Sequence, residues 1–180
     1  MNKPDSQAPS GNKPNARQIF HVNINCANLD RSRAFYELIG FTVVNDFESA
    51  APGERARTFA EIGLARILRL PGDCDARALL LALSDDPHAT RLDLIEWIRP
   101  QSAPHVRGDL ARIGFGRLCL KVRDCRNLHD RLVAAGHTVY SPPIRIDMGG
   151  TYQLVFCCED PDGTVVEFMQ FLRAETGSGR

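Results

Sequence analysis

Hydrophobic and polar residues follow a pattern that occurs twice between residues 18 and 172. Each copy opens with a short run in which apolar and polar residues alternate, at 20–26 and at 116–122. Alternation of this kind predicts a half-buried strand. Helical spacing of apolar residues follows, and each predicted helix ends at a glycine, Gly40 or Gly136, which tolerates the left-handed backbone of a helix C-cap. These two glycines lie 96 residues apart, and the two copies align at this offset without a gap into the next strand.

The two halves also end alike, because the segments 94–98 (LIEWI) and 165–169 (VVEFM) match at an offset of 71. The first half therefore holds 25 more residues, which we place within 47–89. There the pattern predicts a helix at 56–64 and a buried strand at 78–83. In the second half it predicts a loop at 141–150, a strand at 152–158, an Asp-Pro-Asp-Gly turn at 160–163 and a last strand at 164–171.

These elements predict an α+β fold made of a βαβββ unit that occurs twice. We expect a disordered tail at 1–17, a first module at 18–98, a linker at 99–113, a second module at 114–172 and a second tail at 173–180.

Composition narrows the class of protein. The 180 residues are 43% hydrophobic and 24% charged, which is typical of a globular protein. The 22 basic and 22 acidic residues cancel, so no charge excess favours nucleic acid or a membrane surface as a partner. The longest apolar run, 78–83, is too short to cross a bilayer. The first residues show no apolar export segment and the six cysteines form no C-x-x-C pair, so we expect a cytoplasmic protein with reduced thiols.

Two glutamates in apolar strands are the first candidates for chemistry. Glu96 and Glu167 alternate with apolar residues, and a carboxylate in such surroundings is costly unless it is paired or binds a metal. Two of them at matching places predict one pseudo-symmetric site. His21 and Arg117 occupy equivalent positions in the first strand of each half. His21 with both glutamates would suit a divalent metal. A structural ion pair between Arg117 and a glutamate is the alternative.

The segment 21–41 (HVNINCANLDRSRAFYELIGF) resembles the opening of glyoxalase I-like proteins of the vicinal oxygen chelate superfamily. In that family a strand His precedes a helix of the form L-x-x-S-x-x-F-Y-x-x-x-G-F. Segments 92–97 (LDLIEW) and 159–168 (EDPDGTVVEF) resemble its two glutamate-bearing strands. The resemblance implies tandem βαβββ modules whose curved sheets form a cup around a divalent metal (Zn, Ni, Mn, Fe or Co). The implied ligands are His21, Glu96, Glu167 and the position of Arg117.

The resemblance also implies a function. It predicts a lyase, isomerase or epimerase that acts on a small α-oxygenated substrate, such as a hemithioacetal or an acyl thioester. The metal would stabilise an enediolate while Glu167 or Glu96 moves the proton. Members of the family often form homodimers, so we expect one here.

Arg117 departs from the family pattern, which has His there in glyoxalases and epimerases, and Arg does not ligate metals. Three outcomes stay open. A metal is held by His21, Glu96 and Glu167 with water; or Arg117 pairs with Glu167 in a metal-free site; or Arg117 binds a substrate carboxylate beside a weaker metal site.

Two other functions compete with catalysis. One is metal-free sequestration of a drug-like molecule in an apolar cup, and the other is a structural or regulatory role. Tyr152 is a candidate wall of such a cup, whereas alternation places Trp97 and Phe168 opposite the glutamates, in the core. The loop 141–150 is a candidate cover for the cup, and its Arg145 is a candidate contact for an anionic substrate.

Overall fold

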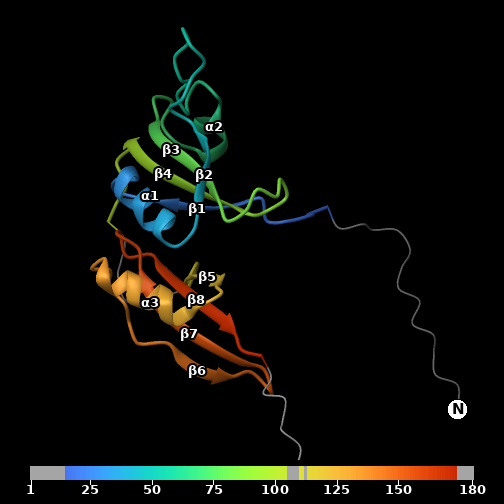
Figure 1. Cartoon of the computed structure of the whole chain (residues 1–180). Coiled ribbons are helices and arrows are strands. Elements are labelled where there is room, and N and C mark those ends of the chain that lie inside the picture. The colour runs from blue at the N-terminus through green and yellow to red at the C-terminus, as the bar shows by residue number, and fades with distance from the viewer. Residues whose placement is uncertain (1–14, 105–109, 112, 174–180) are drawn as a thin grey trace, which may run out of the picture.

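The chain forms two sheets, each with its own helix, in a computed structural model that describes residues 15–104, 110–111 and 113–173 (Figure 1). The first module lies above the second in this view. The tails predicted at 1–17 and 173–180 fall almost wholly outside the described residues, and so does part of the predicted linker. No helix among the described residues is both long and apolar enough to cross a membrane.

The first module contains a four-stranded sheet in the order β1-β4-β3-β2. Strands β1 and β4 are parallel, and the other neighbours are antiparallel. The side chain of Asn28 accepts a hydrogen bond of 2.8 Å from the Arg31 N–H and so begins helix α1. Gly40 follows the helix with φ of 111°. The elements are β1 (His21–Asn25), α1 (Leu29–Leu38), β2 (Thr42–Asp46), α2 (Leu64–Leu68), β3 (Asp75–Ala82) and β4 (Arg91–Arg99).

The second module repeats this order as β5-β8-β7-β6, with β5 parallel to β8. Asp124 caps helix α3, as Asn28 caps α1. The elements are β5 (Leu118–Lys121), α3 (Cys125–Ala134), β6 (Ile144–Asp147), β7 (Tyr152–Glu159) and β8 (Val165–Phe171). The predicted α+β fold of two βαβββ modules is thereby confirmed.

Two predicted elements are wrong in detail. The helix expected at 56–64 is irregular chain at 56–58 and turns at 59–63, which lead into the five-residue helix α2. The loop expected at 141–150 contains strand β6, which forms the edge of the second sheet next to β7. Val139, the residue equivalent to a β2 position, makes only an isolated bridge to Cys158. The outer strand of the second module therefore starts later along the chain than its counterpart in the first.

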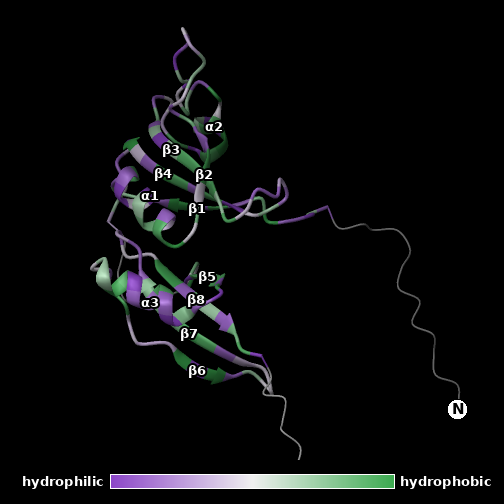
Figure 2. Ribbon diagram, viewed as in Figure 1, coloured by the Kyte–Doolittle hydropathy of each residue, from purple (hydrophilic) through white to green (hydrophobic). Residues whose placement is uncertain are grey.

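The main core lies where the helices pack on their sheets. We call this side of each sheet the helix face and the opposite side the cup face. Leu94 of β4 and Phe168 of β8 are fully buried in one cluster together with residues of both helices. The two modules share this cluster, since the rings of Phe35 and His137 lie 4.9 Å apart. In Figure 2 both helices carry hydrophilic and hydrophobic stretches, as expected when one side packs on a sheet.

The predicted turn at 160–163 joins the second module to helix α1. The Asp160 carboxylate accepts hydrogen bonds from the N–H groups of Asp162 and Thr164, at 2.9 and 2.8 Å, and from the buried Tyr36 hydroxyl at 3.0 Å. Asp162 accepts the Ala27 N–H at 3.0 Å. Burial raises the pKa values of both Asp160 and Tyr36. The turn therefore fixes how the two modules are joined.

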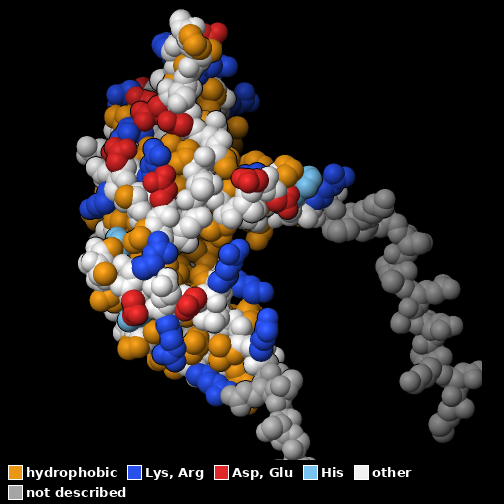
Figure 3. All heavy atoms as spheres, viewed as in Figure 1, with side chains coloured by type: hydrophobic (Ala, Val, Ile, Leu, Met, Phe, Trp, Pro, Cys, Tyr) orange, Lys and Arg blue, Asp and Glu red, His pale blue; other side chains and the backbone are white. Residues whose placement is uncertain are grey.

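The extra residues of the first half cover part of its cup face. Phe59 is buried against Ile95 of β4 and Ala78 of β3, and α2 packs beside them. The cup face of the second sheet is more open, since Cys119 and Phe171 are exposed. Figure 3 shows a hollow between the modules, with hydrophobic side chains inside it and Lys and Arg along its lower rim.

Candidate functional site

The two glutamates lie on opposite faces of their sheets. Glu96 is on the helix face of β4, where its Oε2 accepts the Leu29 N–H at 2.9 Å and pairs with Arg77 at 3.2 Å. Glu167 is on the cup face of β8, because its neighbours Val166 and Phe168 both enter the helix-face core. Glu96 therefore anchors the start of α1, and the expected symmetric pair of glutamates does not form.

The strand registers explain this difference. In the first sheet Asn23 pairs with Asp93, and in the second Cys119 pairs with Glu167. Asn23 and Cys119 are equivalent at the offset of 96, so Asp93 is the structural counterpart of Glu167. The sequence match of Glu96 to Glu167, at an offset of 71, is therefore three residues out of register with the structural match of Asp93 to Glu167. An odd shift moves a strand residue to the other face of the sheet.

Asp93 is thus the cup-face acid of the first module, and sequence reasoning missed it. Burial raises its pKa, while the nearby His21 and a hydrogen bond from Asn23 act in the opposite direction. The signal that would have identified Asp93 is whether the offset between the two matched strands is odd or even, because this decides whether matched residues lie on the same face.

Trp97 and Phe168 also lie on opposite faces of their sheets. Phe168 is fully buried in the helix-face core, as expected. Trp97 lies on the cup face instead, where its indole N–H donates to the Asn25 side chain at 2.9 Å and its ring packs 5.5 Å from that of Phe59. Trp97 therefore lies opposite Glu96 and packs against a core cluster, as alternation predicted, but that face is the cup face because Glu96 itself is on the helix face.

Arg117 and Glu167 form an ion pair on the cup face of the second module, through Arg117 Nε and Glu167 Oε2. The hydrogen bond that Arg117 donates to Glu167 raises the pKa of Arg117. Cys119 and Cys157 are register partners of Glu167 in the two flanking strands. Burial raises the pKa of each thiol, and the Glu167 charge raises it further, so both thiols are protonated at neutral pH. Lys121 lies over the Phe171 ring, 5.1 Å from its centroid.

The residues present do not fit the metal centre that the resemblance implies. His21 is exposed on the cup face, Glu96 is on the other side of its sheet, and Glu167 is held by Arg117. Within residues 15–104, 110–111 and 113–173, no group of three His, Cys, Asp or Glu side chains is placed to hold a metal ion.

Tyr152 and Arg145 contact each other, away from the cup face. The Arg145 guanidinium lies 4.1 Å from the centroid of the Tyr152 ring. Arg145 is the register partner of Leu154, which packs in the helix-face core, and Tyr152 alternates in step with Leu154. The structure therefore does not bring these two predicted substrate contacts together with Arg117.

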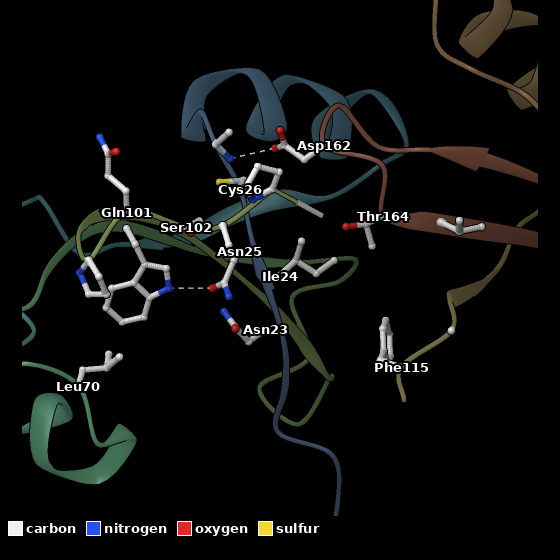
Figure 4. A pocket seen from close by; sticks show the side chains of 17 residues that line it. Asn23, Ile24, Asn25, Cys26, Leu70, Gln101, Ser102, Phe115, Asp162 and Thr164 are labelled. Atoms are coloured by element: carbon white, nitrogen blue, oxygen red, sulfur yellow. Dashed lines mark hydrogen bonds between the residues drawn. The ribbon is translucent and has the colours of Figure 1, made fainter. Parts of the chain in front are cut away.

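A cavity of about 920 Å³ lies where the two modules meet. Asn23 and Asn25 of β1 line one side, with Leu70 and Gln101 beyond them, and Phe115 and Thr164 line the other (Figure 4). Neither His21 nor Glu167 lines it. Its walls come from β1, β4, the start of the linker and the 160–163 turn, so no single sequence motif marks it.

Comparisons with known proteins agree with this architecture. The family model described as Glyoxalase/Bleomycin resistance protein/Dioxygenase superfamily matches residues 18–168. The chain therefore belongs to this superfamily, as the resemblance predicted. No curated protein sequence matches the chain.

Solved structures show the same fold at low sequence identity. A glyoxalase family protein from Bacillus cereus superposes with a TM-score of 0.71 at 18% identity, over 92% of this chain and 100% of that chain. The trypanothione-dependent glyoxalase I of Leishmania major gives a TM-score of 0.54 at 18% identity, over 86% and 87% of the two chains. A glyoxalase/bleomycin resistance protein/dioxygenase domain from Frankia sp. EAN1pec gives 0.56 at 16% identity, over 89% and 96%.

Proposed function

We propose that this chain binds a small organic molecule in the cavity between its modules, without a bound metal. The observation that carries this proposal is that both glutamates already have partners in the protein. Glu96 stabilises the start of α1, and Glu167 is neutralised by Arg117. Both carboxylates therefore have protein partners that a metal would have to displace.

The cavity itself has the character of a ligand site. Its volume of about 920 Å³ falls within the range of small-molecule pockets. Trp97, Leu70 and Phe115 supply apolar surface, and the Asn23 and Asn25 amides supply hydrogen-bonding groups. A mixed lining of this kind favours an uncharged or weakly polar organic ligand.

The guanidinium of Arg117 is a candidate contact for an anionic ligand. Arg117 donates to Glu167 through Nε, and its side chain is 51% exposed. A ligand carboxylate that approaches Arg117 would compete with Glu167 for the guanidinium. We therefore expect organic anions to bind more weakly than neutral ligands unless they reach Arg117.

Fluorescence tests this proposal, because Trp97 is the only tryptophan and it lines the cavity. Titration with a panel of small aromatic and aliphatic compounds, with EDTA present, is expected to give saturable changes in emission for a subset of them. Glu96→Gln is the matched control, and it is expected to leave these affinities unchanged. A complete absence of saturable change, or binding that appears only after a divalent metal is added, would contradict the proposal.

The second candidate is the metal-dependent lyase, isomerase or epimerase predicted from the sequence, acting on a hemithioacetal or an acyl thioester. The observation in its favour is that His21 and Asp93 share the cup face of the first sheet, and Glu167 lies on the cup face of the second. This candidate requires Glu167 to separate from Arg117. Turnover of such a substrate that depends on added metal and is lost in Glu167→Gln would favour it.

The homodimer and the cytoplasmic location stay predictions. Light scattering on the purified full chain tests the first, and imaging of a tagged chain in its native cell tests the second.

A further inference from the structure

An open backbone edge borders the cavity. Strand β1 is the outer strand of its sheet, and among the described strands it pairs only with β4. In a parallel ladder, the N–H and C=O of one residue point to one side and those of the next residue point to the other. The Cys26 N–H donates to β4 at 2.8 Å, and the Phe20 carbonyl accepts from β4 at 2.9 Å, so the even-numbered residues face β4. The backbone groups of Asn23 and Asn25 therefore point away from it.

One end of this outward edge already has a partner. The N–H of Ala27, which is in phase with Asn23 and Asn25, donates to the Asp162 carboxylate of the second module at 3.0 Å. This bond confirms the direction of the outward groups. It also shows that the second module takes up the last position of the edge, whereas no other described strand lies beside the preceding positions along the cavity wall.

We propose that a short peptide in extended conformation binds along this edge as an additional strand, hydrogen-bonded to the backbone of Asn23 and Asn25. The inference rests on the proposed function, since it names the class of ligand that the cavity takes. Strand addition of this kind obtains its affinity from main-chain hydrogen bonds and its specificity from pockets for alternate side chains.

The dimensions fit such a ligand. Asn23 and Asn25 are two residues apart on β1, so their outward groups are spaced for two successive hydrogen-bonding positions of an added strand. At about 3.4 Å per residue, a peptide of about three residues spans both positions. The cavity volume of about 920 Å³ accommodates a molecule of this size. Phe115 and Thr164 lie on the side of the cavity opposite to Asn25, so the peptide would lie between the two modules (Figure 4).

The chemistry of the lining also fits an uncharged peptide. Gln101, Ser102 and Thr164 are neutral hydrogen-bonding residues. Among the described lining residues the one carboxylate is that of Asp162, which is already bonded to Ala27 and Arg31. Trp97, which is fixed by its hydrogen bond to Asn25, offers an apolar wall for a side chain of the peptide.

The test uses nuclear magnetic resonance on the full chain labelled with ¹⁵N. The probes are the blocked tripeptides Ac-Val-Thr-Val-NH₂ and Ac-Phe-Thr-Phe-NH₂, and the same peptides with methylated backbone nitrogens. We expect saturable shifts of the Asn23 and Asn25 amide signals and of the single indole signal with at least one unmodified peptide. The methylated peptides, which lack the donors, are expected to bind at least about tenfold more weakly. Equal binding of methylated and unmodified peptides would overturn the proposal.

A matched pair of variants isolates the backbone contribution. Asn25→Ala and Asn25→Pro both remove the side chain that holds Trp97, but only Asn25→Pro removes the outward N–H. Proline is tolerated on the open side of an edge strand, so the β4 ladder is expected to survive. We expect peptide affinity to fall about tenfold further in Asn25→Pro than in Asn25→Ala. Equal affinities in two folded variants would contradict strand addition, and the methylated peptides keep the test valid if Asn25→Pro does not fold.

The outcome separates this inference from the function on which it rests. Saturable changes of the Trp97 signal with non-peptide compounds, and none with either tripeptide, would refute strand addition and leave metal-free binding intact. The absence of any ligand response at Trp97 would refute both.

Discussion

The two modules have the same order of elements but differ in what lies on their cup faces. In the first, the extra residues bury Ile95 of β4 and cover part of Trp97 with Phe59. In the second, the corresponding face of β8 carries the Arg117–Glu167 pair and ends at the exposed Phe171. A repeated fold therefore does not ensure a repeated site, since one cup face forms a small core and the other carries an ion pair.

The largest expected effect comes from removing apolar side chains on these two faces. Ile95→Ala is expected to lower the free energy of unfolding by about 3 kcal/mol, because Ile95 is 6% exposed and packs in the second cluster. Phe171→Ala is expected to lower it by only about 0.5 kcal/mol, since Phe171 is 48% exposed. Urea denaturation followed by circular dichroism measures both. Equal losses would mean that the two cup faces are covered to the same extent.

A smaller effect separates the two glutamates. Glu96→Ala leaves the Leu29 N–H without its acceptor and removes one of the carboxylates that pair with Arg77, which keeps Glu48 and Asp30, so we expect a loss of about 2 kcal/mol in stability. Glu167→Ala is expected to cost about 1 kcal/mol, because its partner Arg117 is half exposed and water takes over its hydrogen bonds. Thermal denaturation of the two variants beside the unmodified chain checks the order. A larger loss for Glu167→Ala would contradict the structural role given to Glu96.

The smallest effect concerns the thiols beside Glu167. The pKa values of Cys119 and Cys157 lie above the ordinary thiol value of 9.0, so their alkylation by iodoacetamide, which attacks the thiolate, should still accelerate above pH 9.0. Glu167→Gln removes a negative charge that raises these pKa values, so alkylation should become about twofold faster. Arg117→Gln removes a positive charge that lowers them, so alkylation should become slower.

Mass spectrometry of the peptides that carry Cys119 and Cys157 measures these rates. Cys119 is exposed and gives the clearer signal. The reverse order of rates, with Arg117→Gln faster than Glu167→Gln, would show that the ion pair does not set the charge around the two thiols.

Much of the fold was predictable because it rests on local signals. The repeat, the glycines that end the helices and the Asp-Pro-Asp-Gly turn each depend on a few neighbouring residues, and the structure has them where expected: Gly40, Gly136 and Gly163 all have positive φ. The superfamily was also predictable, since its motifs are continuous in sequence.

The candidate site was harder to predict, because a strand residue changes face with each step along the chain. The match of Glu96 to Glu167 was correct in residue type but shifted by three positions, and this shift alone moved the expected acid from the cup face to the helix face. Asp93 was overlooked for the same reason. The cavity depends on contacts between β1, the linker and the 160–163 turn, and such long-range contacts leave no periodic pattern.

We propose that this chain does not assemble a metal centre from His21, Glu96 and Glu167. The most direct measurement is the divalent metal content of the protein purified without chelator, together with its melting temperature before and after addition of Zn²⁺, Ni²⁺, Mn²⁺, Fe²⁺ or Co²⁺. We expect metal well below one equivalent per chain and an unchanged melting temperature. One equivalent of bound metal that raises the melting temperature, and that is lost in either Glu96→Gln or Glu167→Gln, would contradict this expectation.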